Sequence, residues 1–223
     1  MLSRHEDIPK YSLRPAFLRS LYDTAEYVPA TTAKNVLGVA CYLRDYPNTT
    51  DLAKFLNRYR SDAIDATYKV VLVNGGEYDQ SKPTNEGSLD IQYTEAMAYP
   101  TPITFYSTGE GTPAGTVDRM TAWVKFVIDE PKPPQTITTS YGQDESFGSK
   151  EYSVYLCDLF MQLGARGVSL LFATGDGGVG KGNCVRFNPF FPATCMCTVF
   201  LRLGVVRKCG SRTLTTFRIA MLS

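Results

Sequence analysis

Short apolar runs alternate with longer segments of helical periodicity along most of this chain. Runs such as YKVVLVN and ITFYST are short and rich in β-branched and aromatic residues, as strands are, whereas the segments between them repeat apolar residues every three or four positions. Strands that alternate with helices form parallel sheets, so this order predicts an α/β fold with a doubly wound parallel sheet and helices on both faces. We expect right-handed crossovers throughout and an active site at the carboxyl ends of the strands.

The predicted strands span residues 35–43, 68–74, 103–108, 136–142 and 168–175. The predicted helices span residues 51–60, 85–99, 115–129 and 149–167. Pro100 and Pro102 stop the second helix, and Gly167 closes the last one. A chain of 223 residues is long enough for one domain of this kind.

A glycine-rich segment, GDGGVGKG, follows the last predicted strand and is similar to a phosphate-binding loop. Gly175, Gly180 and Lys181 match the G-x-x-x-x-G-K pattern, but Gly182 stands where a hydroxyl is needed for Mg²⁺. Such a loop also needs a helix directly after its lysine. Pro189 and other residues of GNCVRFNPFFPATC exclude a long helix there, so the sequence argues against nucleotide binding.

The charges are unevenly distributed along the chain. Every Asp and Glu lies at or before Asp176, and seven basic residues but no acid follow it. A basic tail can bind nucleic acid or an anionic membrane, or it can be foreign to the domain that precedes it. No window approaches 18 uninterrupted apolar residues, and the N-terminus lacks the apolar region of a signal peptide. We expect neither a nucleic-acid partner nor a membrane partner.

Three carboxylates lie where the predicted fold would place an active site. Glu86 and Asp90 are spaced i, i+4 on one helix face, and Asp176 lies in the glycine loop. An acid in a first helical turn also favours the helix dipole, and an acidic pair is often only a solvated face. Two adjacent carboxyls can instead share a proton, so that one acts as a base in acid conditions. His5 is the only histidine, which argues strongly against a Ser-His-Asp or Cys-His hydrolase.

The six cysteines carry no metal-binding signature. Cys195 and Cys197 are too close for a C-x-x-C pair. The chain has a single histidine, so histidines cannot supply the further ligands that a metal site would need. Cys184 and Cys195 flank a short loop, where they can form a disulfide or remain as free buried thiols. We expect no metal ion and no cofactor in this chain.

Four stretches form an ordered set of motifs: NEGSLDIQYTEAMAYPTPITFYSTG (85–109), PKPPQTITTSYGQDE (131–145), LFMQLGARGVSLLFATGDGGVG (159–180) and FNPFFPATC (187–195). A fifth, LRSLYDTAEYVPATTAKNVLGVACYL (18–43), resembles the start of a mature catalytic domain that follows a propeptide. Over roughly residues 16–195 the chain resembles the sedolisins, or serine-carboxyl peptidases, especially fungal tripeptidyl-peptidase-like members. The resemblance implies a subtilisin-like α/β fold and acid-active proteolysis, as an endopeptidase or a tripeptidyl-peptidase.

The resemblance also implies roles for individual residues. Glu86 corresponds to the general base of the family's E-x-x-x-D motif, and Asp90 to the carboxylate that orients it and shares its proton. Asp176 corresponds to a protonated acid that donates a hydrogen bond to the oxyanion of the tetrahedral intermediate. Substrate-binding positions correspond to Tyr141, Gly142 and Gly175, and a family disulfide corresponds to Cys184 and Cys195.

The chain departs from the family pattern after Cys195. Thr174 replaces the usual Ser, which is a mild change, but the segment MCTVFLRLGVVRKCGSRTLTTFRIAMLS does not match the family and no G-T-S nucleophile segment occurs. We therefore expect an N-terminal segment (1–15), a partial peptidase domain (16–195) and a basic out-of-family tail (196–223), with the sheet incomplete at its C-terminal end. The family's calcium site would lie in the missing C-terminal part.

These features predict a truncated serine-type peptidase that is inactive as given, because the nucleophilic serine is missing. The alternative is a catalytically dead remnant that binds peptides in the same cleft. By resemblance, we expect a secreted monomer that acts on peptides or proteins, with a vacuolar or lysosomal location as the alternative.

Overall fold

The computed structural model describes residues 13–29, 35–110, 116–176 and 189–195, together with the backbone of two short strands at 206–207 and 214–215. The statements below concern these residues. Gly180, Lys181 and Cys184 lie outside them, as does most of the segment after Cys195. The domain boundaries at residues 15 and 195 therefore stay predictions.

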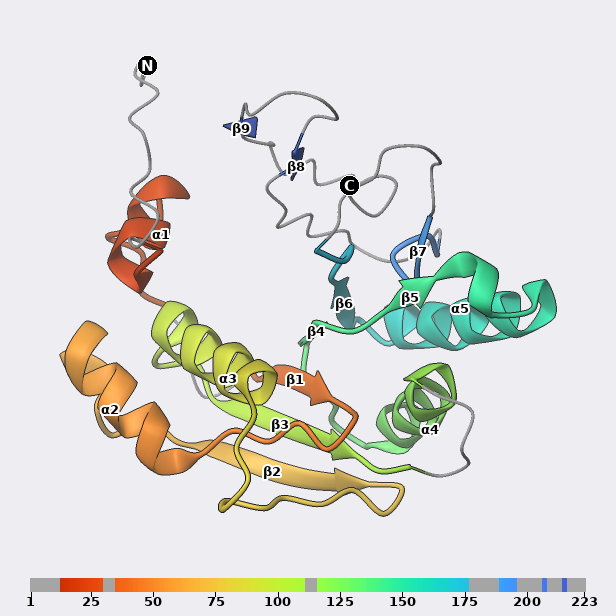
Figure 1. Ribbon diagram of the computed structural model, residues 1–223, viewed down its shortest axis with the longest axis horizontal. Coiled ribbons are helices and arrows are strands. Elements are labelled where there is room, and N and C mark those ends of the chain that lie inside the picture. Colours follow the sequence, from red (N-terminus) through yellow and green to blue (C-terminus); the bar gives the residue numbers. More distant parts are fainter. Residues whose placement is uncertain are drawn as a thin grey trace.

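A five-stranded parallel sheet forms the centre of the molecule, in the order β2-β3-β1-β4-β6 (Figure 1). Its strands are β1 (Leu37–Cys41), β2 (Tyr68–Val73), β3 (Ile103–Thr108), β4 (Thr136–Thr139) and β6 (Ser169–Phe172). Every residue of β3 is buried, as expected for a strand covered on both faces, whereas the edge strand β2 is only partly buried. The predicted α/β fold with a parallel sheet is confirmed.

Five α-helices surround the sheet: α1 (Pro15–Leu21), α2 (Thr49–Tyr59), α3 (Asn85–Ala98), α4 (Thr116–Asp129) and α5 (Lys150–Ala165). Side chains cap three of them, because Asn48, Thr84 and Ser149 each accept a hydrogen bond from the backbone N–H three residues ahead. Short 3₁₀ helices occur at Ser61–Ala63 and Glu145–Phe147. The four predicted helices are confirmed to within a few residues, and α1 was not predicted.

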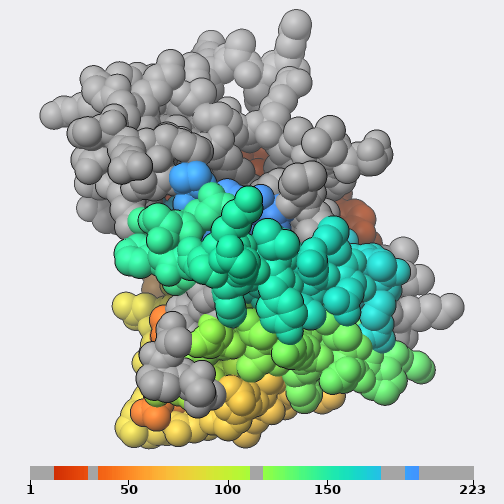
Figure 2. Space-filling view, turned by 90° about the vertical axis from the view of Figure 1, so that its right-hand side faces the viewer, coloured from red at the N-terminus to blue at the C-terminus, as the bar shows by residue number. Residues whose placement is uncertain are grey.

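Helices cover both faces of the sheet. The side chain of Cys41 in β1 contacts Asp90 of α3, whereas Tyr106, which pairs with Ala40, packs its ring against Trp123 of α4. Since alternate residues of a strand point to opposite faces, α3 and α4 lie on opposite sides of the sheet. Helix α2 packs on α3, and α5 packs on α4. Figure 1 shows these two pairs on either side of the strands, and Figure 2 shows the face formed by α4 and α5.

One crossover departs from the expected hand. The chain moves in opposite directions across the sheet from β1 to β2 and from β2 to β3, yet α2 and α3 lie on the same face. These two crossovers therefore have opposite hands. The crossovers through α4 and α5 share the hand of the one through α2. Parallel crossovers are right-handed in about 98% of cases, so the crossover through α3 is the left-handed one, and the expectation of right-handed crossovers throughout is wrong there.

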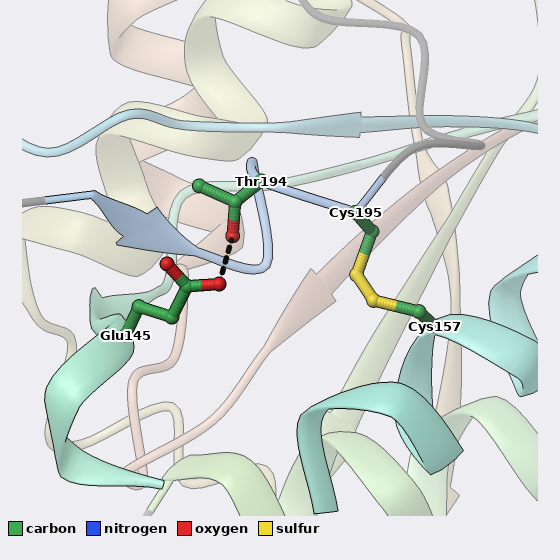
Figure 3. Close-up of a disulfide and its surroundings, with 4 residues drawn as sticks. All are labelled: Glu145, Cys157, Thr194 and Cys195. Carbon is green, nitrogen blue, oxygen red and sulfur yellow. Dashed lines mark hydrogen bonds between the residues drawn. A yellow bond between two sulfur atoms is a disulfide. The ribbon is translucent and has the colours of Figure 1, made fainter. Parts of the chain in front are cut away.

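The predicted disulfide between Cys184 and Cys195 is wrong, because Cys195 is bonded to Cys157 of α5 (Figure 3). The Cα atoms of this pair are 5.5 Å apart. Cys195 follows β7 (Phe190–Phe191), which pairs with β5 (Gln143–Asp144) in a small antiparallel sheet. A local loop suggested the nearer partner in the sequence, but the packing of β7 beside α5 brings a residue 38 positions away into range.

The remaining strands, β8 (Val206–Arg207) and β9 (Leu214–Thr215), pair with each other. Within the described part of the chain, no helix is long and apolar enough to cross a bilayer.

Candidate active site

The candidate site lies at the carboxyl ends of β1, β4 and β6, beside the first turns of α3. Strands β1 and β4 are neighbours, but the helices that follow them pack on opposite faces of the sheet. In open α/β sheets, ligands bind at the carboxyl ends of strands whose connections diverge in this way. The predicted strands 136–142 and 168–175 end earlier in the structure, at Thr139 and Phe172.

Glu86 and Asp90 lie one turn apart on α3, both partly buried. The helix begins where it does because the Thr84 hydroxyl accepts a hydrogen bond from the N–H of Gly87 at 3.2 Å. Gly87 also permits a close approach: a Cβ there would lie 2.5 Å from the carbonyl carbon of Tyr46. The absence of a side chain at Gly87 therefore lets α3 press against the loop after β1.

Two donors, one in β1 and one just after β4, hold the carboxylate of Asp90. The Ser140 hydroxyl donates to its Oδ1 at 2.7 Å, and the Cys41 thiol donates to its Oδ2 at 3.6 Å. Burial raises the pKa of Asp90 to about 6, and the charge of Glu86 contributes, although both hydrogen bonds oppose the rise. Asp90 thus holds a proton in mildly acid conditions, as a carboxyl that shares a proton with its neighbour would.

The pKa of Glu86 depends on the carboxyls around it. Burial raises its pKa first, and the charges of Asp45 and Asp176 raise it further, against an opposing hydrogen bond from Ser140. The structure therefore brings Asp176 within electrostatic reach of Glu86. Asp176 is exposed and follows Gly175, whose φ of +75° is a conformation that glycine adopts without strain.

Asp45, on the loop after β1, is a member of the cluster that the sequence did not reveal. Its Oδ2 accepts a hydrogen bond from the Tyr141 hydroxyl at 2.5 Å. Leu43 and Arg44, just before it, both have left-handed φ values of 58° and 61°. Such a conformation costs a non-glycine residue on the order of 1–3 kcal/mol and tends to occur at functional sites. After this turn, Asp45 lies beside Tyr141, and its charge reaches Glu86 and Asp90.

Tyr141 was expected to line a substrate cleft, but its ring is only 7% exposed. Burial raises the pKa of its hydroxyl, and the neighbouring Cys41 and Asp45 add to the rise, so the hydroxyl remains a donor to Asp45. Its side chain therefore positions Asp45, and the expected substrate-binding role of Tyr141 and Gly142 stays a prediction.

The cluster can carry out acid–base chemistry. Among Asp45, Glu86, Asp90 and Asp176, neighbouring charges raise the pKa values of Glu86 and Asp90, which favours protonated and shared-proton states of that pair. Sequence reasoning found three of these carboxyls through the helical spacing and the glycine loop, but it missed Asp45 and Ser140. Among the described residues, no group of three or more His, Cys, Asp and Glu side chains is placed to hold a metal ion. The expected absence of a metal or cofactor stays a prediction.

Known proteins similar to this chain are fungal peptidases. A probable tripeptidyl-peptidase SED3 from Arthroderma benhamiae is 33% identical over 205 residues, and a probable tripeptidyl-peptidase SED2 from Trichophyton verrucosum is 32% identical over 202. These alignments cover 82% and 81% of this chain but only 35% and 34% of the relatives, so the chain spans about a third of their length. No protein-family model matches the chain.

The fold has a counterpart among solved structures. Pseudomonas sedolisin, a serine-carboxyl proteinase complexed with pseudo-iodotyrostatin, superposes with a TM-score of 0.62 over 84% of this chain and 52% of the other. Its sequence identity of 19% means that this comparison supports the fold alone. Together with the fungal relatives, the comparisons support one conclusion: the chain belongs to the sedolisin family of serine-carboxyl peptidases.

Proposed function

We propose that this chain forms the acid–base half of a sedolisin-type peptidase site, which binds peptides in acid conditions. The observation that carries the proposal is the pair Glu86 and Asp90, whose pKa values are both raised by burial and by neighbouring carboxyls. A base whose pKa lies near an acid operating pH is suited to acid catalysis. The fungal relatives are named tripeptidyl-peptidases, and these names favour the hypothesis that such a site removes tripeptides over the hypothesis that it cleaves internal bonds.

Glu86 would take a proton from a serine nucleophile, and Asp90 would hold the shared proton and orient Glu86. Asp176 would donate a hydrogen bond from its carboxyl to the oxyanion that forms on the peptide carbonyl. Its exposed position at the end of β6, within reach of Glu86, supports this role.

The 223 residues contain no G-T-S segment, so we propose that they bind peptides without cleaving them. The second candidate is a catalytically dead remnant of such a site that serves only as a peptide-binding module, and the same absence of a nucleophile segment favours it. We also propose a monomer that is secreted or vacuolar, with peptides rather than nucleic acid or membranes as partners. This rests on the family relationship.

The test is peptide binding as a function of pH. A hexapeptide with a free N-terminus and a C-terminal fluorophore is titrated with the protein, and anisotropy gives Kd from pH about 4 to about 8. We expect binding at acid pH that weakens above the pKa of Asp90, about 6, because the cluster then gains negative charge that repels peptide carbonyl oxygens. The variant D90N stays neutral, so its Kd should depend less on pH.

The control is D51N, which removes an exposed carboxylate of α2 that pairs with Lys54. Its pH profile should match that of the wild type. Equal profiles for wild type and D90N would contradict the proposed role of the pair. Release of a labelled product by the wild type at acid pH would contradict the absence of turnover, and stabilisation by ATP would favour nucleotide binding instead.

A further inference from the structure

The side chain of Phe190 lies between two loops that the site brings together. A Cβ on Gly142 would lie 2.3 Å from its Cε1 atom, and a Cβ on Gly175 would lie 3.0 Å from its Cε2 atom. One edge of the ring therefore touches the loop after β4, and the opposite edge touches the loop after β6. Both glycines leave room for the ring, since a side chain at Gly142 would overlap with it.

Several interactions hold Phe190 in place. Its strand β7 pairs with β5, so that Phe190 lies opposite Asp144, and the N–H of Glu145 donates to the carbonyl of Pro189 at 3.0 Å. Farther along, the Thr194 hydroxyl donates to Glu145 at 3.3 Å and Cys195 is bonded to Cys157 (Figure 3). The backbone on both sides of Phe190 is thus held in place, and this positions the ring.

The location of the ring relates it to a bound peptide. Gly142 follows Ser140, which bonds to Asp90, and Gly175 precedes Asp176, whose charge reaches Glu86. In the proposed function, a peptide bound by Asp176 beside Glu86 and Asp90 would lie near these two glycines. The Phe190 ring occupies the space between them and is only partly buried.

We propose that Phe190 determines specificity: its ring occupies the space between Gly142 and Gly175 and restricts the peptide side chain that enters there to small residues. This inference rests on the proposed function, because it requires a peptide bound at the carboxyl ends of the strands. It adds a selectivity for peptide side chains, which neither the carboxyl cluster nor the family relationship assigns. A larger side chain would have to displace a ring that β-pairing and a disulfide hold in position.

The experiment compares peptides that differ in one residue. Hexapeptides with a free N-terminus carry Ala, Leu or Phe at the third position, because the relatives are named tripeptidyl-peptidases. Anisotropy at acid pH gives Kd for the wild-type chain and for F190A. We expect the wild type to prefer Ala, and F190A to change the Kd ratio by about tenfold or more in favour of Leu and Phe, as a pocket enlarged by several carbon atoms does.

Two further variants keep the result interpretable. F190L retains most of the packing if F190A does not fold, and it should shift the ratio in the same direction by a smaller factor. F126A is the matched control: Phe126 of α4 is also partly exposed and packs on Tyr106, away from both glycines, so the ratio should stay unchanged.

Peptide binding with the same preference in wild type, F190A and F190L would overturn the role of Phe190 and leave the peptide site intact. Failure of the wild type and all variants to bind any peptide would overturn both this inference and the proposed function. A shift in F126A equal to that in F190A would also overturn the inference, because the effect would then come from general loosening.

Discussion

Asp90 shows how the tertiary structure sets the chemistry of one side chain. Its carboxylate projects from α3 one turn after Glu86, is partly buried, and accepts hydrogen bonds from Ser140 and Cys41. Burial and the neighbouring charge favour the protonated form, whereas the two donors favour the ionised form. The pKa of about 6 is the balance of these opposing effects, so removing one donor should move it in a known direction.

We predict that S140A raises the pKa of Asp90 further above 6, because the ionised carboxylate loses the donor at 2.7 Å. The shift can be measured by following the side-chain carboxyl carbon by NMR during a pH titration. S81A is the control, since Ser81 donates to the exposed Asp79 in the same way. An unchanged or lowered pKa of Asp90 in S140A would show that the hydroxyl does not stabilise the ionised form.

The sequence revealed Glu86 and Asp90 because helical spacing places them on one face, which is a local property. It did not reveal Asp45 or Ser140. Each is an ordinary polar residue just after a strand, and only the adjacency of β1 and β4 brings them to the same carboxyl pair. The spacing therefore located the base, and the packing supplied its partners.

The position of β7 depends on a disulfide between two cysteines that are far apart in the sequence. Cys195, just after β7, is bonded to Cys157 of α5, 38 residues earlier, and β7 also pairs with β5. Closing a loop of that length lowers the entropy of the unfolded chain, which corresponds to about 3–4 kcal/mol of stability in the chain-entropy model. The bond thus stabilises the element that carries Phe190.

We predict that the double variant C157S/C195S lowers the free energy of unfolding by about 3–4 kcal/mol, measured by urea denaturation. Dithiothreitol should destabilise the wild type by a similar amount and have little further effect on the double variant. Peptide mapping of the unreduced protein should recover Cys157 linked to Cys195. Recovery of Cys184 linked to Cys195 would contradict the structure and restore the pairing that the family resemblance implied.

At the scale of the whole molecule, stability should depend on pH through a carboxyl outside the candidate site. Glu95 of α3 is 2% exposed, and its Oε1 has no hydrogen-bond partner among the described residues. Burial raises its pKa to about 8 from the usual 4.5. The folded protein therefore keeps a proton on Glu95 that the unfolded chain releases above pH 4.5. This stabilisation is complete below that pH and is lost as the pH rises towards 8.

We predict that E95Q is less sensitive to pH than the wild type. The wild type should lose roughly 3–5 kcal/mol of stability between pH 4.5 and 8 through Glu95, whereas a neutral amide cannot ionise. Thermal unfolding followed by circular dichroism across this range measures the difference. E26Q, which changes an exposed glutamate, should retain the wild-type profile, and equal slopes for wild type and E95Q would contradict the prediction.

The sequence by itself determined the order of strands and helices, the parallel sheet and the carboxyls of α3 and the glycine loop. Periodicity, capping residues and breakers act over a few residues, so a single sequence displays them. Only the tertiary structure decided the left-handed crossover through α3, the partner of Cys195, the approach of Ser140 and of the charge of Asp45 to the carboxyl pair, and the place of Phe190 between two glycines. Those features arise where segments distant in the sequence meet, and the free energy of that packing depends on all of them at once.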